Sequence, residues 1–155
     1  MCRLEDNPQF ILDTKAMQFQ SRLARYYFEK YILEVAIATL ENGGVASNPA
    51  IYQFLPTMDT WSFPKYPERT AILPPEVDLA DELKSFIAAN EPLLREPDCW
   101  LGTWINPRTH HFYLDISTSC DDLDEARKTA LELSERAGRK IVALYNSKRK
   151  ETVYL

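Results

Sequence analysis

The chain has 155 residues, a net charge of −5 at neutral pH and a hydrophobic content of 45%. These values are typical of one folded domain, so we expect a single domain over residues 1–155 and exclude a chain that is disordered throughout. The acidic balance argues against a general affinity for nucleic acid or anionic membranes. No apolar run approaches the roughly 20 residues of a membrane span, and residues 1–6 lack the pattern of a signal peptide.

The cysteines indicate the compartment. There are three of them, Cys2, Cys99 and Cys120, and none forms a Cys-x-x-Cys pair. An odd number without short spacing fits a reducing cytoplasm better than a disulfide framework. The four glycines form neither a phosphate-binding loop nor a dinucleotide fingerprint, which excludes nucleotide binding through these common motifs. We therefore expect a cytoplasmic protein with no cofactor and no bound metal.

The first predicted element is a long helix over residues 14–41. It has Thr14 as a candidate N-cap, no internal proline or glycine, and a stop signal at residues 42–44. One face is predicted to pack on the core: Ala24, Tyr27, Phe28, Tyr31, Ile32, Val35 and Ala38. A second apolar patch lies among the charged residues: Phe19, Tyr26, Leu33, Ile37 and Leu40. A helix that is apolar on two sides is expected to be covered on both, so we predict a homodimer or another protein partner bound through Phe19, Tyr26, Leu33 and Ile37.

Residues 45–75 contain six prolines and many aromatic side chains. Proline removes a backbone donor and disfavours both helix interiors and central strands. We therefore predict an ordered but irregular crossing over the core, with at most one short strand or helical turn near residues 50–55. Aromatic side chains hold irregular segments to a core, and they are also frequent anchors of interfaces. Trp61, Phe63 and Tyr66 are therefore either packed on the core or the second candidate surface for a protein partner.

The remaining elements are predicted from clear local patterns. A helix over residues 78–90 begins at the candidate cap Asp78. Two β-rich segments, 99–106 and 111–118, form a hairpin, and a helix then runs from Asp121 to the stop at Gly138. Residues 140–145 and 151–155 form a second hairpin. The sequence thus predicts an α+β fold, in which a helical and proline- and aromatic-rich part (1–98) packs with an antiparallel ββαββ unit (99–155).

The ββαββ unit also carries a family resemblance. The residues concerned are Trp104-Ile105-Asn106-Pro107, Tyr113-Leu114-Asp115-Ile116-Ser117, the alanine-rich helix and the closing Val153-Tyr154-Leu155. Over residues 99–155 the chain resembles a ββαββ element of uncharacterised phage and prophage proteins. The resemblance implies a fold element and a mobile-element origin, and it implies no activity.

Two further functions remain open at this point. The basic residues near the second hairpin are Arg139, Lys140, Lys148, Arg149 and Lys150, and they favour nucleic-acid binding as an alternative. A small enzyme would need a pocket beneath the aromatic loop that brings together Asp59, Asp115 and His111. No catalytic motif supports the enzyme. The leading hypothesis is a non-catalytic protein that acts as an accessory or inhibitory partner of another macromolecule or of itself.

Overall fold

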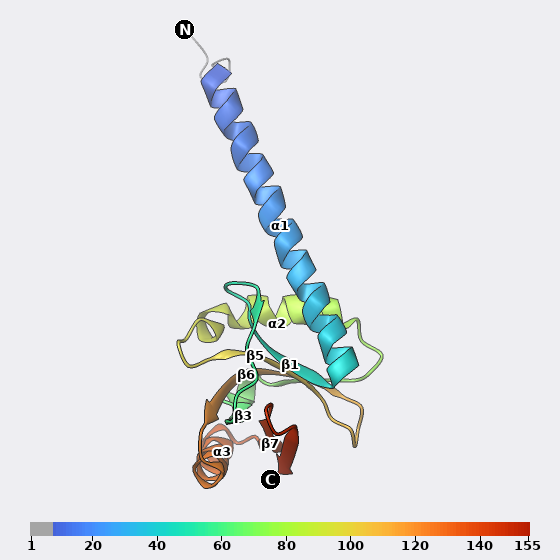
Figure 1. Cartoon of the computed structure of the whole chain (residues 1–155), viewed down its shortest axis with the longest axis vertical. Helices are drawn as coiled ribbons and strands as arrows, with labels where there is room; N and C mark the ends of the chain where they lie inside the picture. Colours follow the sequence, from blue (N-terminus) through green and yellow to red (C-terminus); the bar gives the residue numbers. More distant parts are fainter. Residues whose placement is uncertain (1–7) are drawn as a thin grey trace.

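The computed structural model describes residues 8–155 and shows an α+β fold, as the sequence predicts (Figure 1). The helices are α1 (Pro8–Asn42), α2 (Leu79–Leu94) and α3 (Leu123–Ala137), with a short 3-10 helix, η2 (Pro67–Arg69). The strands are β1 (Gly44–Asn48), β2 (Gln53–Phe54), β3 (Trp61–Pro64), β4 (Ala71–Leu73), β5 (Trp100–Ile105), β6 (Phe112–Cys120), β7 (Ala143–Asn146) and β8 (Glu151–Tyr154). None of the helices in residues 8–155 has the length and apolarity needed to span a membrane.

Helix α1 is longer than predicted and projects from the body of the protein (Figure 1). It begins at Pro8, so Thr14 lies inside the helix and is not its cap. The helix packs on the body only from Phe28 onward, because almost every described side chain before that point is exposed. The predicted core positions Ala24 and Tyr27 are therefore exposed, whereas the later members of the predicted face are buried or partly buried. A helix of this kind presents a long solvent-exposed surface.

The segment predicted to be irregular instead supplies four strands, β1 to β4, to the sheet. The correction is largest for β3, which pairs with both β6 and β7 and is thus a central strand. Proline is tolerated here because Pro64 is the last residue of the strand, opposite Ser117 of β6. Trp61 and Phe63 alternate along β3 and are each only 3% exposed. The aromatic segment is therefore part of the sheet and of the core.

The other predicted elements are confirmed within a few residues. Strands β5 and β6 form the predicted hairpin, and β7 and β8 form the second one. Helix α3 is capped by Asp122, whose carboxylate accepts a hydrogen bond from the Glu125 N–H at 2.9 Å, and it ends at Gly138 with a left-handed φ of 65°. Asp78 caps α2 as predicted, but the helix continues past Asn90 through a kink to Leu94.

The strands of residues 8–98 and of residues 99–155 form one antiparallel sheet. Its order is β2-β1-β5-β6-β3-β7-β8, and β4 also pairs with β6. The first residues of β6 pair with β4, and the last four residues of β6 pair with β3. The short strands β3 and β4 therefore lie along the same edge of β6. Residues that pair across antiparallel strands lie on the same face, and the register therefore assigns each side chain to one of two faces.

One face of the sheet forms the core. Leu101, Leu114 and Ile116 are fully buried there in a cluster that includes residues of α1 and α2. Trp61, Phe63 and Leu144 lie in a second cluster with the small residues of α3. No helix of the described chain contributes to the other face apart from the ends that border it. This second face holds the candidate site.

Candidate functional site: a cavity on the open sheet face and an apolar helix seam

The open face of the sheet encloses a cavity of about 630 Å³. Its walls include Val45 and Ala46 of β1 as well as Tyr145 of β7 and Thr152 of β8, which are far apart in the strand order. The sheet must therefore curl so that strands from its two sides face each other across the cavity. This volume is in the range of pockets that hold a small organic ligand.

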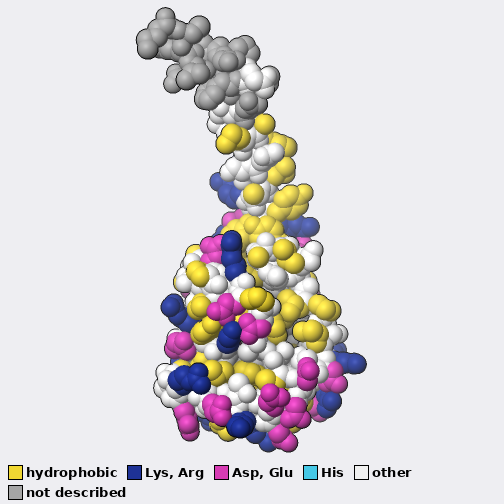
Figure 2. Space-filling view, turned by 90° about the vertical axis from the view of Figure 1, so that its left-hand side faces the viewer, with side chains coloured by type: hydrophobic (Ala, Val, Ile, Leu, Met, Phe, Trp, Pro, Cys, Tyr) yellow, Lys and Arg dark blue, Asp and Glu magenta, His cyan; other side chains and the backbone are white. Residues whose placement is uncertain are grey.

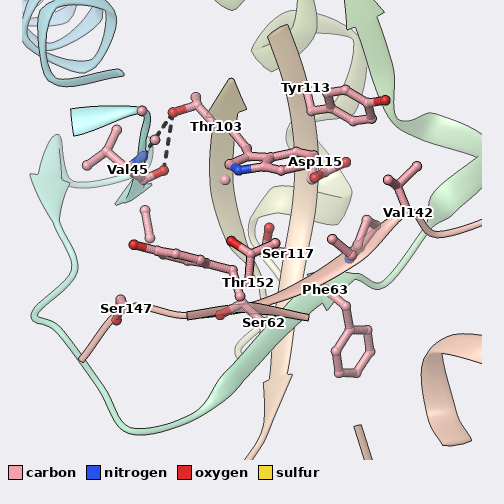
Figure 3. Close-up of a pocket in the computed structure, with 18 of the residues that line it drawn as sticks. Val45, Ser62, Phe63, Thr103, Tyr113, Asp115, Ser117, Val142, Ser147 and Thr152 are labelled. Atoms are coloured by element: carbon pink, nitrogen blue, oxygen red, sulfur yellow. Dashed lines mark hydrogen bonds between the residues drawn. The ribbon is translucent and has the colours of Figure 1, made fainter. Parts of the chain in front are cut away.

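Asp115 lies in the floor of the cavity. It occupies the middle of β6 between Tyr113 and Ser117, which share its face, and Figure 3 shows the three side chains along this strand. On β5 the residue opposite Asp115 is Gly102. A Cβ atom on Gly102 would collide with the Ser117 hydroxyl. The glycine thus leaves space for the Ser117 hydroxyl.

The environment of Asp115 favours its neutral form. Burial raises the pKa of its carboxyl group to about 6, against the opposing effects of the Thr70 hydroxyl and the Arg139 charge. Thr70 Oγ1 donates a hydrogen bond to Asp115 Oδ1 at 2.6 Å. Arg139 does not pair with the carboxylate, because its Nη1 donates to the backbone oxygen of Thr70 at 2.6 Å. Asp115 therefore keeps acceptor capacity that no other side chain of residues 8–155 uses.

Aromatic side chains form one wall of the cavity. Trp104 and Tyr113 are opposite each other on β5 and β6, and their rings meet edge to face with centroids 5.1 Å apart. The ring of Tyr154 is also close to Trp104, with the two ring centroids 6.3 Å apart. Trp100 and Tyr145 also line the cavity. The cavity therefore has a wide aromatic surface next to the Asp115 carboxyl group, against which a planar ring can stack.

The predicted basic residues do not act as one cluster. Lys140 and Lys150 line the cavity and are exposed, and neither ammonium group has a hydrogen-bond or ion-pair partner within residues 8–155. Arg149 Nε instead pairs with Asp59 Oδ1 at 2.8 Å, and this contact lowers the pKa of the Asp59 carboxyl group. Lys148 is exposed and does not line the cavity. Two of the five predicted cations are thus free at the cavity.

The three groups of the enzyme hypothesis lie in different environments. Asp59 is bound to Arg149 and to the side-chain amide of Asn146. The Nδ1 atom of His111 lies 3.0 Å from the backbone oxygen of Thr109 in the hairpin turn. Of the three predicted residues only Asp115 lines the cavity. The structure therefore provides no common site for the three groups.

A second candidate surface runs along α1. Ala16, Phe19, Leu23, Tyr26, Lys30, Leu33, Ile37 and Leu40 follow one another in alternating steps of three and four residues. We call this set the α1 seam. Its large apolar members Phe19, Tyr26 and Leu33 are 62%, 60% and 53% exposed. Figure 2 shows hydrophobic side chains continuing from the projecting helix onto the body. Alternating steps of three and four residues are the pattern of coiled-coil helices.

The seam lies on a different face of α1 from the side chains that pack on the body. Tyr31, Ile32 and Val35 are at most 1% exposed and belong to the core. The predicted interface residues Phe19, Tyr26, Leu33 and Ile37 are all more than half exposed. The helix is therefore apolar on two faces, of which the described structure covers one.

The aromatic loop residues do not form a free surface. Trp61 and Phe63 are buried beneath α3, and Tyr66 is partly buried against the core of α1 and α2. The Tyr66 hydroxyl donates to Glu96 at 2.6 Å. Of the two interpretations of these residues, burial favours packing on the core over an exposed recognition surface. Pairing of β3 turns the Trp61 and Phe63 rings toward the core, and Tyr66 packs on the core just after the strand.

One acidic cluster lies outside both surfaces. Ligand atoms of Glu96, Asp98 and Cys99 lie within 4.8 Å of one another. However, Lys65 Nζ donates to Glu96 at 2.8 Å and to Asp98 at 3.0 Å. Burial raises the pKa of Cys99 to about 12, which keeps this group a thiol. The cluster is therefore a charge pair that ties β3 to the end of α2.

The sequence analysis missed most of the cavity. It placed Trp104, Tyr113 and Asp115 on strands but did not bring them together, because that requires the β5–β6 register and the curl of the sheet. Comparisons with family models, curated proteins and solved structures give no match to the chain. The functional argument therefore depends on the two surfaces just described.

Proposed function

We propose that the protein is a non-catalytic protein-interaction module whose α1 seam pairs with the α1 seam of a second copy. The observation that carries this proposal is the run of exposed apolar side chains in coiled-coil spacing from Ala16 to Leu40. A projecting helix without a packed face is only marginally stable in water. A second helix along the seam would pack against α1 both in its projecting part and beside the body.

An antiparallel arrangement fits the seam best. In parallel pairing, Lys30 would face the same lysine of the second copy inside the seam, a repulsive contact. With residue 28 at the crossing point of antiparallel helices, Lys30 instead faces Tyr26 of the second copy. A lysine against a tyrosine ring is attractive. The same register places the small Ala16 opposite the large Leu40.

The test is the solution mass of two matched variants. Phe19 lies on the seam and Met17 lies off it, and both are exposed in the projecting part of α1. Wild type is expected to have twice the chain mass of 18.0 kDa by light scattering at micromolar concentration. Phe19→Glu is expected to weaken dimerisation at least about 100-fold, since the symmetric interface loses two apolar contacts. Met17→Glu is expected to remain dimeric.

Two outcomes would contradict the proposal. One is a wild-type protein that stays monomeric at high concentration, and the other is an equal effect of Phe19→Glu and Met17→Glu. Neither substitution touches the body, and the three tryptophans lie on β3 and β5, so tryptophan fluorescence controls for the folding of the body. A Phe19→Cys, Ile37→Cys double variant that forms a crosslinked dimer, while Phe19→Cys alone does not, would establish the antiparallel register.

We also propose the cytoplasm as the compartment and a phage or prophage as the origin. Cys99 and Cys120 are free thiols, as expected in a reducing environment, and Cys2 lies outside the described residues. The origin is supported by the resemblance of residues 99–155 alone. Location of the gene within integrated phage DNA would test the origin, and fractionation of host cells would test the compartment.

A further inference from the structure

We propose that the cavity on the open sheet face binds a nucleotide, with its base against the Trp104–Tyr113 wall, the donor edge of the base on Asp115 and the phosphate at Lys150. All four side chains line the same cavity. The inference is independent of the helix pairing, since none of the α1 seam residues lines this cavity. The ligand chemistry follows from the floor, the wall and the rim of the cavity, taken in turn.

The wall fits a planar heteroaromatic ring. Trp104 and Tyr113 form an edge-to-face pair, and Trp100 and Tyr145 extend the aromatic surface around the cavity. Bases stack on such side chains in single-strand binding sites, and each stacked base contributes substantially to affinity. Purely aliphatic ligands would gain less from this wall because they lack a π face.

The floor fits a ring with hydrogen-bond donors. Asp115 accepts one hydrogen bond from Thr70 and lines the cavity with acceptor positions that no other side chain of residues 8–155 uses. A carboxylate offers two neighbouring oxygens to two neighbouring donors. Among the common bases, guanine presents such a pair on one edge, the ring N1–H and the exocyclic N2 amino group. We therefore expect guanine nucleotides to bind most tightly.

The rim fits an anionic group. Lys140 and Lys150 lie at opposite ends of the β7–β8 hairpin, because Ala143 pairs with Tyr154 at one end and Asn146 with Glu151 at the other. The Lys150 ammonium group, in the hairpin turn, is exposed and has no partner within the described chain, whereas the neighbouring Arg149 is bound to Asp59. An unpaired cation beside a cavity is an attractive position for a phosphate, and it provides a local positive charge on an acidic protein. The polarity of the cavity, with a carboxyl group in the floor and an ammonium group at the rim, matches the two ends of a nucleotide.

The experiment uses the whole chain with guanosine monophosphate, inosine monophosphate and free guanosine as ligands, and calorimetry as the readout. Guanosine monophosphate is expected to bind saturably at micromolar to millimolar concentration. Inosine monophosphate differs from it by lacking the N2 amino group and is expected to bind about tenfold more weakly, the effect of one hydrogen bond to a charged group. Free guanosine, which has no phosphate, is expected to bind more weakly as well.

Three variants assign the contacts. Asp115→Asn is expected to weaken guanosine monophosphate about tenfold and to remove its advantage over inosine monophosphate. Lys150→Ala is expected to weaken both nucleotides by the same factor, because the phosphate is common to them. Lys148→Ala is the matched control, since it removes a lysine from the same turn that does not line the cavity, and it is expected to leave the affinity unchanged.

A second binding experiment distinguishes a free nucleotide from the end of a nucleic-acid chain. Tighter binding of a short single-stranded oligonucleotide that ends in guanosine would identify a nucleic-acid end as the natural ligand, and equal or weaker binding would identify a free nucleotide. The proposal is overturned if neither monophosphate binds saturably at millimolar concentration. It is also overturned if Asp115→Asn and Lys150→Ala bind as wild type does.

Discussion

Replacing Leu114 by Ala is expected to lower the free energy of unfolding by about 3 kcal/mol, within the range observed for buried leucine truncations. Leu114 is 0% exposed and lies in the middle of β6, on the face that packs against α1 and α2. The strand is bonded to β4 and β5 at this point, so the backbone cannot easily move to fill the space. Urea unfolding followed by far-ultraviolet circular dichroism measures the change.

The matched control for this prediction is Ile72→Ala. Ile72 lies on the neighbouring strand β4, pairs with Tyr113 and faces the open side of the sheet, where it is 42% exposed. Its truncation is expected to cost less than about 1 kcal/mol, because an exposed side chain loses little packing. Equal costs for Leu114→Ala and Ile72→Ala would contradict the assignment of a core face and an open face.

The C-terminal part could be predicted from sequence because its signals are local. Asp122 caps α3 through a residue three positions away, and Gly138 ends it with a left-handed φ. The β5–β6 hairpin likewise joins strands that are neighbours in the chain. Each of these interactions lies within a few residues, so the sequence pattern and the structure report the same physical cause.

The strands of residues 44–73 could not be predicted in this way. Strand β3 is held by β6 and β7, which lie more than 50 and 80 residues later in the chain. Its four residues end in Pro64, and proline weighs against a central strand in any local reading. Pairing with distant strands outweighs that local preference. The same pairing buries Trp61 and Phe63, which an irregular loop would have left available for a partner.

The two candidate surfaces differ in how far sequence predicts them. Helical periodicity alone places Phe19 and Tyr26 on a second apolar face of α1, and in the structure these side chains are 62% and 60% exposed. The cavity depends on which strand faces which, since Gly102 lies opposite Asp115 only in the β5–β6 register. Its rim adds Lys140 and Lys150 from the far end of the sheet. Long-range register and sheet curl are not encoded in any short segment.

Replacing Asp115 by Asn is expected to stabilise the protein at pH 8 by about 2 kcal/mol relative to wild type, with little effect at pH 4. The folded-state pKa of Asp115 is raised from its ordinary value of 3.8 to about 6, first because the group is buried. The fold therefore favours the protonated carboxyl group. The stability that protonation supplies is complete below pH 4 and is lost as the pH rises through 6. Asparagine keeps an acceptor for Thr70 and carries no charge.

The measurement is urea unfolding of wild type and Asp115→Asn between pH 4 and pH 8. Asp59→Asn is the control with the opposite sign. Hydrogen bonds from Arg149 and Asn146 lower the pKa of Asp59, so its contribution is present above the unfolded-state pKa and is lost as the pH falls. An Asp115→Asn variant whose stability parallels wild type across the whole range would show that this carboxyl group is not destabilised by its burial.

The same measurement connects the fold to the proposed ligand. If ionised Asp115 is destabilising in the empty cavity, a ligand that donates hydrogen bonds to it relieves that cost in the bound state. Saturating guanosine monophosphate is therefore expected to raise the free energy of unfolding of wild type at pH 8 more than that of Asp115→Asn. At pH 5 the Asp115 carboxyl group is protonated in most molecules, and the difference between the two proteins is expected to shrink. If the ligand stabilised the two proteins equally at pH 8, Asp115 would not take part in ligand binding.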